Sequence, residues 1–174
     1  IDSLNPQVGS KLIDLASGTG DIAKLYLEQI NYRGSVSCVD ENKEMLNLSK
    51  NKLKNNTNAK WFCNSAESLP FKNNVFDYYT ISFGIRNINN INNALKEAHR
   101  VLKPGGRFLC LEFSKVKNQT LNKIYKAYSK SIPKIGKIIV GQSEPYEYLI
   151  DSIEKFYTQE QFFKEIKKKK LFKY

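Results

Sequence analysis

The sequence has little of what metal sites and disulfide frameworks require. Its 174 residues include one His and three Cys, and Cys38, Cys63 and Cys110 form no Cys-x-x-Cys pair. We therefore expect no metal site built on His or clustered Cys. Each Cys lies in an apolar run typical of a strand, so we expect buried free thiols in a reducing compartment.

Long hydrophobic runs are also missing. No apolar stretch approaches the ~20 residues that a membrane-spanning helix needs, and no signal peptide or targeting segment is visible. The chain begins with Ile and opens in a polar turn, so we expect a piece of something longer, truncated at both ends. Its length and 41% hydrophobic content predict one domain, residues 1–174, around a single core.

Positive charge is in excess. The formal net charge is +11, from 28 Lys+Arg against 17 Asp+Glu, and much of this excess lies in residues 164–173. A solvated, lysine-rich helix end explains it most simply. Aromatic residues do not alternate with the basic ones as a stacking platform requires, so we predict no nucleic-acid partner. Contact with an anionic membrane surface stays open as an alternative.

Apolar runs alternate with helical periodicity along most of the chain. The pattern predicts strands at 11–15, 35–39, 61–63, 76–83 and 107–113, and helices at 21–30, 45–53, 91–102, 146–156 and 159–169. In the first helix, Ile22, Leu25, Tyr26 and Ile30 carry the apolar spacing, and residues 103–106 are expected to form a turn. Helix and loop are expected after Ser114. Alternation of this kind predicts an α/β fold with a mostly parallel sheet flanked by helices.

A glycine turn follows the first strand. Gly18 and Gly20 would let a ligand approach the backbone closely, at the amino end of a helix. Asp40 ends the next strand about 20 residues later, where a carboxylate can hold ribose hydroxyls. Gly18-x-Gly20-x-x-Ala23 also fits a dinucleotide fingerprint, but Asp14 favours S-adenosylmethionine because an acid suits its ammonium group. The alternative for Asp14 is a buried acid that accepts loop N–H bonds.

The segment Asp14–Asp21 resembles the first motif of the Rossmann-like class I methyltransferases, with Ala16 in place of the usual first glycine. Segment 65–71 resembles their loop over the adenine base, and 102–108 their helix-turn-strand. The resemblance implies bound S-adenosyl-L-methionine, held by residues that follow the carboxyl ends of the strands: Asp14, Ala16, Ser17, Gly18, Thr19, Gly20, Asp40, Glu41, Met45, Ser65, Ala66 and Ser82.

Three further segments, 80–87, 111–114 and 132–153, resemble the ubiquinone/menaquinone biosynthesis C-methyltransferases. The resemblance implies methylation of a ring carbon of a polyprenylated benzoquinol or of demethylmenaquinol. It implies Arg86 as the group that stabilises the developing phenolate, with Asn87 orienting it and Tyr146 holding a ring oxygen. The alternative makes Arg86 an ion-pair partner that fixes its loop. We expect His99 to be a surface residue and Glu112 to anchor a loop.

The resemblance also sets expectations for the rest of the protein. The antiparallel hairpin that usually ends this fold is expected to be missing, which leaves five parallel strands with an open edge. We expect peripheral membrane contact and a homodimer or a quinone-biosynthesis complex. The location implied is the matrix side of the mitochondrial inner membrane for a eukaryotic source, and the cytoplasm for a bacterial one. Alternative functions are another small-molecule or lipid methyltransferase, or a non-catalytic cofactor-binding scaffold.

Overall fold

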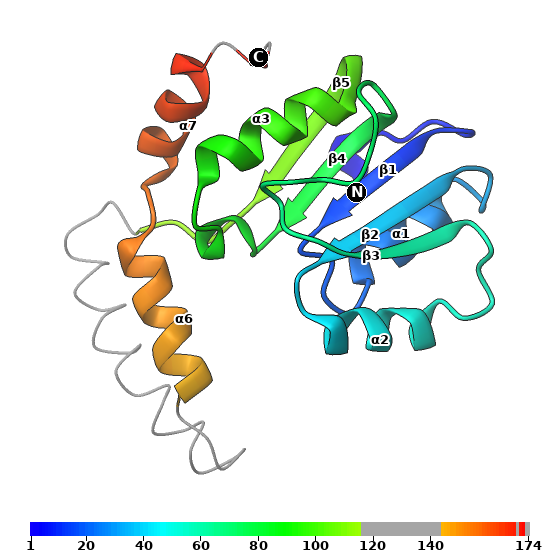
Figure 1. Cartoon of the computed structure of the whole chain (residues 1–174), viewed down its shortest axis with the longest axis horizontal. Helices are drawn as coiled ribbons and strands as arrows, with labels where there is room; N and C mark the ends of the chain where they lie inside the picture. The colour runs from blue at the N-terminus through cyan, green and yellow to red at the C-terminus, as the bar shows by residue number, and fades with distance from the viewer. Residues whose placement is uncertain (116–143, 170, 173–174) are drawn as a thin grey trace. The chain divides into compact units, whose positions relative to one another are not determined.

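The structure is a computed structural model that describes residues 1–115, 144–169 and 171–172 (Figure 1). The chain divides into two compact units, Ile1–Glu112 and Phe113–Tyr174, which are described separately. The predicted helix and loop between Ser114 and the first helix of the second unit lie outside the described residues. Among the residues that are described, no helix is long and apolar enough to cross a membrane.

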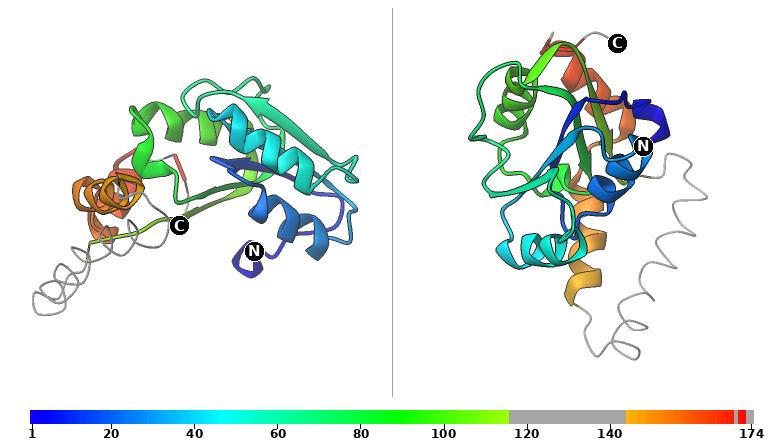
Figure 2. Two further views of the ribbon diagram at one scale, coloured as in Figure 1. Left: turned by 90° about the horizontal axis from the view of Figure 1, so that it is seen from below. Right: turned by 90° about the vertical axis from the view of Figure 1, so that its right-hand side faces the viewer.

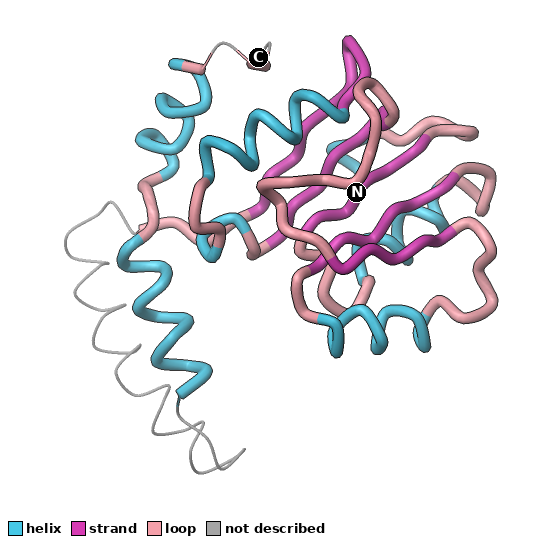
Figure 3. The backbone as a smooth tube through the Cα atoms, in the orientation of Figure 1, coloured by secondary structure: helices cyan, strands magenta, loops and turns pink. Residues whose placement is uncertain are grey.

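The first unit is a five-stranded parallel sheet with helices on its faces (Figures 1 and 3). Its strands lie in the order β3-β2-β1-β4-β5, and every neighbouring pair is parallel. The elements are η1 (Asp2–Leu4), β1 (Lys11–Leu15), α1 (Asp21–Gln29), β2 (Ser35–Asp40), α2 (Lys43–Lys52), β3 (Ala59–Cys63), β4 (Phe76–Ser82), η2 (Ile85–Asn87), α3 (Ile91–Val101) and β5 (Leu102–Leu111). The predicted Rossmann-like α/β fold is confirmed.

The order of the strands indicates where on this sheet a ligand would bind. The chain runs outward from β1 to β3 and then returns to the centre as β4, so the strand order reverses between β1 and β4. In open α/β sheets, ligands bind outside the carboxyl ends of the strands at such a reversal. A ligand site is therefore expected at the segments that follow β1 and β4. In the described part of the chain β5 is an edge strand, as predicted.

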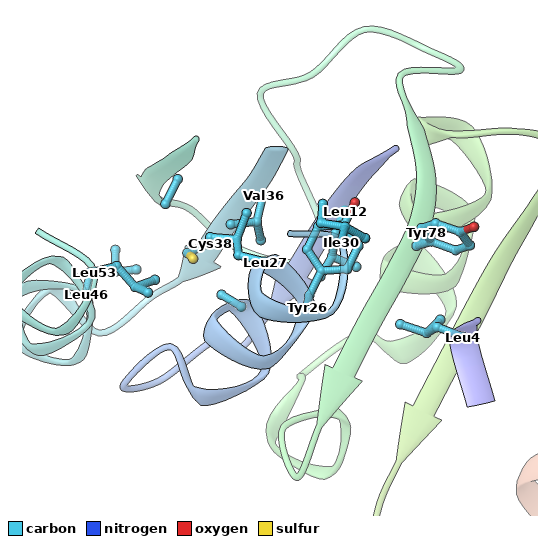
Figure 4. Packing of buried hydrophobic residues seen from close by; sticks show 12 residues of the cluster. Leu4, Leu12, Tyr26, Leu27, Ile30, Val36, Cys38, Leu46, Leu53 and Tyr78 are labelled. Atoms are coloured by element: carbon cyan, nitrogen blue, oxygen red, sulfur yellow. The ribbon is translucent and has the colours of Figure 1, made fainter. Parts of the chain in front are cut away.

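Helices α1 and α2 pack on the same face of the sheet, over a cluster of buried residues (Figure 4). The cluster contains Leu4, Leu12, Ala23, Tyr26, Leu27, Ile30, Val36, Cys38, Leu46, Leu53, Ala59 and Tyr78. The buried stripe of α1 is Ala23, Tyr26 and Leu27, and the buried C-cap residue Ile30 continues it at the i, i+3, i+4, i+7 spacing of one helix face. The predicted stripe was wrong at Leu25, which is 52% exposed.

Helix α3 covers the opposite face, next to β4 and β5 (Figures 1 and 2). It begins at the cap Asn90, whose side chain accepts a hydrogen bond from Asn93 N. Its buried residues are Ala94, Leu95, Ala98 and Val101. The solvent side carries His99, which is exposed as expected.

The predicted turn after α3 was wrong in one respect. Residues 103–106 belong to β5, as an irregularity in its pairing with β4, because Leu102 pairs with Phe76 while Arg107 already pairs with Tyr78. Gly105 adopts a φ of 79° there. The strand therefore bulges next to Asp77, whose carboxylate pairs with Lys103 at 2.6 Å. It ends at Leu111, two residues before the predicted limit.

The second unit contains α6 (Glu144–Lys155) and α7 (Gln159–Lys168), close to the predicted bounds. Phe156 is buried between them and contacts the rings of Tyr157 and Phe162. A capping box starts α7: the Thr158 hydroxyl accepts from Gln161 N, and the Gln161 side chain accepts from Thr158 N.

Candidate functional site

The turn after β1 adopts backbone conformations that favour glycine. Ala16, Gly18 and Gly20 have φ values of 50°, 51° and 81°. Gly20 then starts α1 from the left-handed region, so the N–H groups of the first helical turn follow the turn directly. Ala16 occupies a conformation that costs an alanine about 1 kcal/mol, which is the local consequence of replacing the usual glycine.

The two glycines of this turn have different surroundings. A methyl group on Gly18 would meet nothing within 4 Å, so the backbone there faces open space. A methyl group on Gly20 would lie 2.3 Å from Ser49 Oγ, and that hydroxyl also accepts a hydrogen bond from Trp61 Nε1. Gly18 therefore leaves open space at the backbone, and Gly20 leaves room for α2. That both glycines admit a ligand stays a prediction.

Asp40 joins this turn to the end of β2. Its Oδ2 accepts from Gly18 N at 2.8 Å, and its Oδ1 accepts from Asn42 N at 2.8 Å. Asn42 in turn caps α2 by accepting from Glu44 N and Met45 N. A carboxylate offers about four lone-pair directions. Asp40 can therefore accept two further hydrogen bonds, as the hydroxyls of a ribose would provide.

Asp14 is buried in the sheet, three residues before Ser17. Thr80, its direct neighbour on β4, donates its hydroxyl to Asp14 Oδ1 at 2.8 Å. Among the described residues Asp14 Oδ2 and Ser17 Oγ are the two buried side-chain atoms that make no hydrogen bond. Such atoms are costly unless a partner arrives. The donors and acceptors of this turn thus fit a ligand that brings a polar group to Asp14 and Ser17.

Burial raises the pKa of Asp14 from 3.8 to about 7. The Thr80 hydroxyl lowers it, the negative charges of Asp40 and Asp21 raise it, and the amide of Ala23 lowers it. Burial dominates because a carboxylate loses its hydration inside the sheet. The carboxyl group can therefore carry a proton near neutral pH, and an incoming cation would favour its ionised form.

The segment after β4 packs directly against the glycine turn. A methyl group on Gly84 would lie 2.3 Å from Cβ of Ala16. Phe83, which precedes Gly84, has a φ of 57° and a 41% exposed side chain. Backbone strain of this kind often accompanies functional sites. Ala16 and Gly84 thus bring the candidate cofactor turn and the candidate catalytic loop into contact.

Arg86 lies in η2 and is held by Glu112, which follows β5. Its Nη1 donates to Glu112 Oε1 at 2.6 Å and to the carbonyl of Phe83 at 2.6 Å. The two side chains are 8% and 5% exposed. Arg86 N also donates to Glu112 Oε2 at 3.3 Å. The ion pair that was the alternative interpretation of Arg86 is present, and it places the guanidinium in a fixed position at the carboxyl ends of β4 and β5.

The remaining predicted residues of the first unit lie at the same edge of the sheet. Ser82 ends β4, Asn87 ends η2 with an exposed side chain, and Met45 is 39% exposed on the first turn of α2. Thr19 and Glu41 belong to the turns after β1 and β2, and Ser65 and Ala66 belong to the loop after β3. Tyr146 belongs to α6 in the second unit, and its side chain lies outside the described residues.

Sequence reasoning missed three residues of this site. The Thr80 hydroxyl donates to Asp14. Ser49 occupies the space where a side chain at Gly20 would lie, and the missing side chain of Gly84 leaves room for Ala16. Thr80 and Ser49 are polar residues in otherwise apolar patterns, which is a usable signal, but their partners depend on strand register and helix docking.

The thiols and the acidic residues add no metal site. Among the described residues, no group of three His, Cys, Asp or Glu side chains could hold a metal ion. All three Cys are free, as expected. Cys38 is buried and Cys110 partly buried, but Cys63 is exposed at the end of β3, so the expectation of burial was wrong there.

Comparisons with known proteins agree with this geometry. The sequence profile of the ubiE/COQ5 methyltransferase family matches residues 1–174. A Rickettsia bellii protein named ubiquinone/menaquinone biosynthesis C-methyltransferase UbiE is 52% identical over 164 residues, covering 90% of this chain and 66% of that protein. A Rickettsia prowazekii protein of the same name is also 52% identical, with the same coverage. The chain thus spans just under two thirds of the length of these relatives.

A solved structure supports the fold. A Bacillus halodurans protein superposes with a TM-score of 0.70 at 18% identity, over 96% of this chain and 64% of its own. At that identity the likeness concerns the fold alone, and it agrees with the parallel sheet described above. The sequence profile covers every residue, which confirms the resemblance inferred from residues 80–87, 111–114 and 132–153. The chain belongs to the ubiE/COQ5 methyltransferase family.

Proposed function

We propose that this protein is an S-adenosylmethionine-dependent C-methyltransferase of quinone biosynthesis, acting on a ring carbon of a polyprenylated benzoquinol or of demethylmenaquinol. The family match along the whole chain and the name of the 52% identical relatives support this reaction. The observation that carries the proposal is the turn after β1. Gly18 faces open space there, Asp40 is bound to it, and Asp14 keeps one buried oxygen without a partner.

The residues of the turn fit the parts of S-adenosylmethionine. Asp40 would accept the ribose hydroxyls, and Gly18 would let the cofactor lie against the backbone. Asp14 would receive the ammonium group of the amino acid portion. Met45 has an exposed side chain at the start of α2, where it can cover the adenine. The loop containing Ser65 and Ala66, together with Glu41, would bound the base from the β3 side.

The bound cofactor supplies an electrophilic methyl group on a sulfonium centre. The quinol ring carbon would attack this methyl group, so that the new C–C bond forms as the C–S bond of the sulfonium breaks. The neutral thioether would leave, and the ring carbon would then lose its proton to a base or to water. Deprotonation of the neighbouring hydroxyl makes that carbon electron-rich, and the phenolate needs stabilisation. We assign this role to Arg86, whose guanidinium is held by Glu112 and by the Phe83 carbonyl. Asn87 is adjacent and would orient the ring, and Tyr146 would hold a ring oxygen.

The proposed substrate also indicates where in the cell the protein acts. A polyprenylated quinol resides in a membrane, so we propose peripheral membrane contact of the protein. The second unit provides a basic helix for it, with Lys164, Lys167 and Lys168 exposed on α7 beside Phe163, which is 45% exposed. The relatives named above are bacterial, which supports a cytoplasmic location over the mitochondrial alternative. A homodimer or a complex with other enzymes of the pathway remains part of the proposal.

Cofactor titration and a methylation assay test the reaction. Calorimetry should detect S-adenosylmethionine binding, and short-tailed demethylmenaquinol or benzoquinol should be methylated. Arg86→Gln should keep cofactor affinity within about threefold and lose roughly 10²-fold or more of the methylation rate. Because this change leaves Glu112 buried without its ion pair, the double variant Arg86→Gln/Glu112→Gln serves as the folding control.

Arg107→Gln is the matched control variant. Arg107 lies on β5 opposite Tyr78 and donates to the carbonyl of Leu4, away from the carboxyl ends of the strands. It should retain methylation. Absence of cofactor binding would contradict the enzyme proposal. Binding without methylation of any quinol would favour the scaffold alternative, and unchanged methylation in Arg86→Gln would refute the catalytic role of Arg86.

A further inference from the structure

The strongest unused feature of the first unit is the buried pair Asp14 and Thr80. The two residues are direct neighbours in the register of β1 and β4. Asp14 is 1% exposed and Thr80 is 2% exposed, so their polar groups have no access to bulk water. The pair lies where the strand order reverses. A buried carboxyl group at such a place requires partners for both oxygens.

The hydrogen bond divides the roles of the two carboxyl oxygens. The Thr80 hydroxyl has a single proton to donate. Its oxygen Oγ1 lies 2.8 Å from Asp14 Oδ1 but 3.5 Å from the carbonyl oxygen of Ile13. The proton is therefore donated to Asp14. Oδ2 makes no hydrogen bond, and Ser17 Oγ, three residues further along the turn, makes none either. One oxygen is thus fixed by the sheet, and the other is left for a donor that enters at the turn.

We propose that Thr80 is a positioning residue of the cofactor site: its hydroxyl holds one oxygen of Asp14, directs the other to the ammonium group of the cofactor, and makes cofactor binding release the Asp14 proton. This inference rests on the proposed function, since it deepens how the same site recognises S-adenosylmethionine. The carboxylic acid gives its proton to the solvent as the ammonium group arrives, and a buried ion pair replaces a buried neutral acid.

The charges around Asp14 favour this exchange. Cys38 is the direct neighbour of Asp14 on β2, and Asp40 ends the same strand. Asp21 starts α1, where Lys52 pairs with it at 2.7 Å. Burial is the main cause that raises the pKa of Asp14 to about 7, and the negative charges of Asp40 and Asp21 add to it. Among the described residues, no positively charged side chain contributes to the pKa shift of Asp14. A bound cation would therefore supply the counter-charge of the carboxylate. Thr80 is the side chain that lowers the pKa, because its hydroxyl stabilises the ionised form.

Calorimetry with S-adenosylhomocysteine measures the coupling, since this probe keeps the amino acid portion of the cofactor. Repeating the titration at pH 6 in buffers of different ionisation enthalpy should reveal release of most of one proton per site in the wild type. Affinity should rise roughly fivefold from pH 6 to pH 7. Methylthioadenosine, which lacks the amino acid portion, should bind without either effect.

Thr80→Val removes the hydroxyl at nearly constant volume, and Thr80→Ser keeps it. With Val the pH midpoint of affinity should move up by about one pH unit, so binding weakens roughly fivefold at pH 7 and recovers as pH rises. The Ser variant should behave as the wild type. Thr80→Ala offers a second hydroxyl deletion if the valine does not fold.

Three outcomes overturn the inference. Equal weakening at every pH would make Thr80 a purely structural residue, and the absence of proton release in the wild type would remove the coupling itself. Equal proton release with both probes would assign the coupling to another group. Failure of both probes to bind would overturn the proposed function together with the inference, whereas binding of both without the pH effects would overturn the inference alone.

Discussion

Adding one methyl group at Gly84 should disturb the candidate cofactor turn through Ala16. The added Cβ would lie 2.3 Å from Cβ of Ala16, whereas two carbon atoms in contact stand about 3.5–4.0 Å apart. Both atoms are attached directly to the backbone, so no side-chain rotation can separate them. One of the two turns must move by more than about 1 Å. Overpacking of this kind costs roughly 1–3 kcal/mol of unfolding free energy, and we expect the upper half of that range for Gly84→Ala.

Ala16→Gly should rescue this variant. Ala16 has a φ of 50°, where glycine is free of the steric cost that alanine bears, although glycine loses about as much through its greater freedom in the unfolded chain. By itself the change should be nearly neutral. In the double variant the colliding methyl group is gone, so most of the stability should return. The double-mutant cycle should give a coupling energy of about 1–2 kcal/mol.

Urea unfolding followed by tryptophan fluorescence measures this cycle. Trp61, the only Trp of the sequence, lies on β3 and donates to Ser49, so its emission reports on the first unit. Calorimetry of cofactor binding provides a second readout, which should fall in Gly84→Ala and recover in the double variant. If the two substitutions prove additive within about 0.5 kcal/mol, the contact between the turns does not have the energetic role inferred here.

Three further predictions concern stability and cofactor affinity. Because burial raises the pKa of Asp14 from 3.8 to about 7, wild-type unfolding free energy should fall as pH rises through this window. Asp14→Asn should therefore gain up to a few kcal/mol (about 3) relative to wild type between pH 4 and 7 and level off above; a difference independent of pH would contradict this. Gly20→Ala should cost about 1–2 kcal/mol more stability than Gly18→Ala because only the former meets Ser49, while Gly18→Ala should lose more cofactor affinity; the reverse order would refute the division of roles. Thr158→Ala should destabilise α7 by about 1 kcal/mol in circular dichroism and Thr158→Ser should not, so equal losses would argue against the cap.

Local patterns predicted most of the elements. The five strands and their parallel pairing follow from apolar runs separated by helical periodicity. The described bounds agree within two residues, except that β5 begins at Leu102 and not at residue 107. The helix phase was less secure, since Leu25 carries an apolar side chain on the exposed side of α1. Periodicity identifies an amphipathic helix, but two apolar stripes that overlap on the helix surface can both fit the same sequence. The decision between them depends on the face that the sheet covers.

The candidate site divides in the same way. Asp14, Gly18 and Asp40 could be named from spacing alone, because a strand, a glycine turn and a second strand fix their approximate places. The roles of Gly20 and Arg86 could not be assigned in that way. A side chain at Gly20 would collide with Ser49 of α2. Arg86 forms an ion pair with Glu112, which follows β5. Both partners are distant in the sequence.

By itself, then, the sequence determined the α/β fold class and the methyltransferase family, and it identified the candidate turn for the cofactor. These features depend on local patterns, in which the residues that indicate a strand, a helix or a turn lie within that element or next to it in the sequence. Only the tertiary structure decided that Thr80 holds Asp14, that Ala16 meets Gly84 and that Glu112 holds Arg86. Each of these contacts joins the ends of different strands. Their geometry depends on register and on close packing at the sheet's carboxyl edge, which no local pattern encodes.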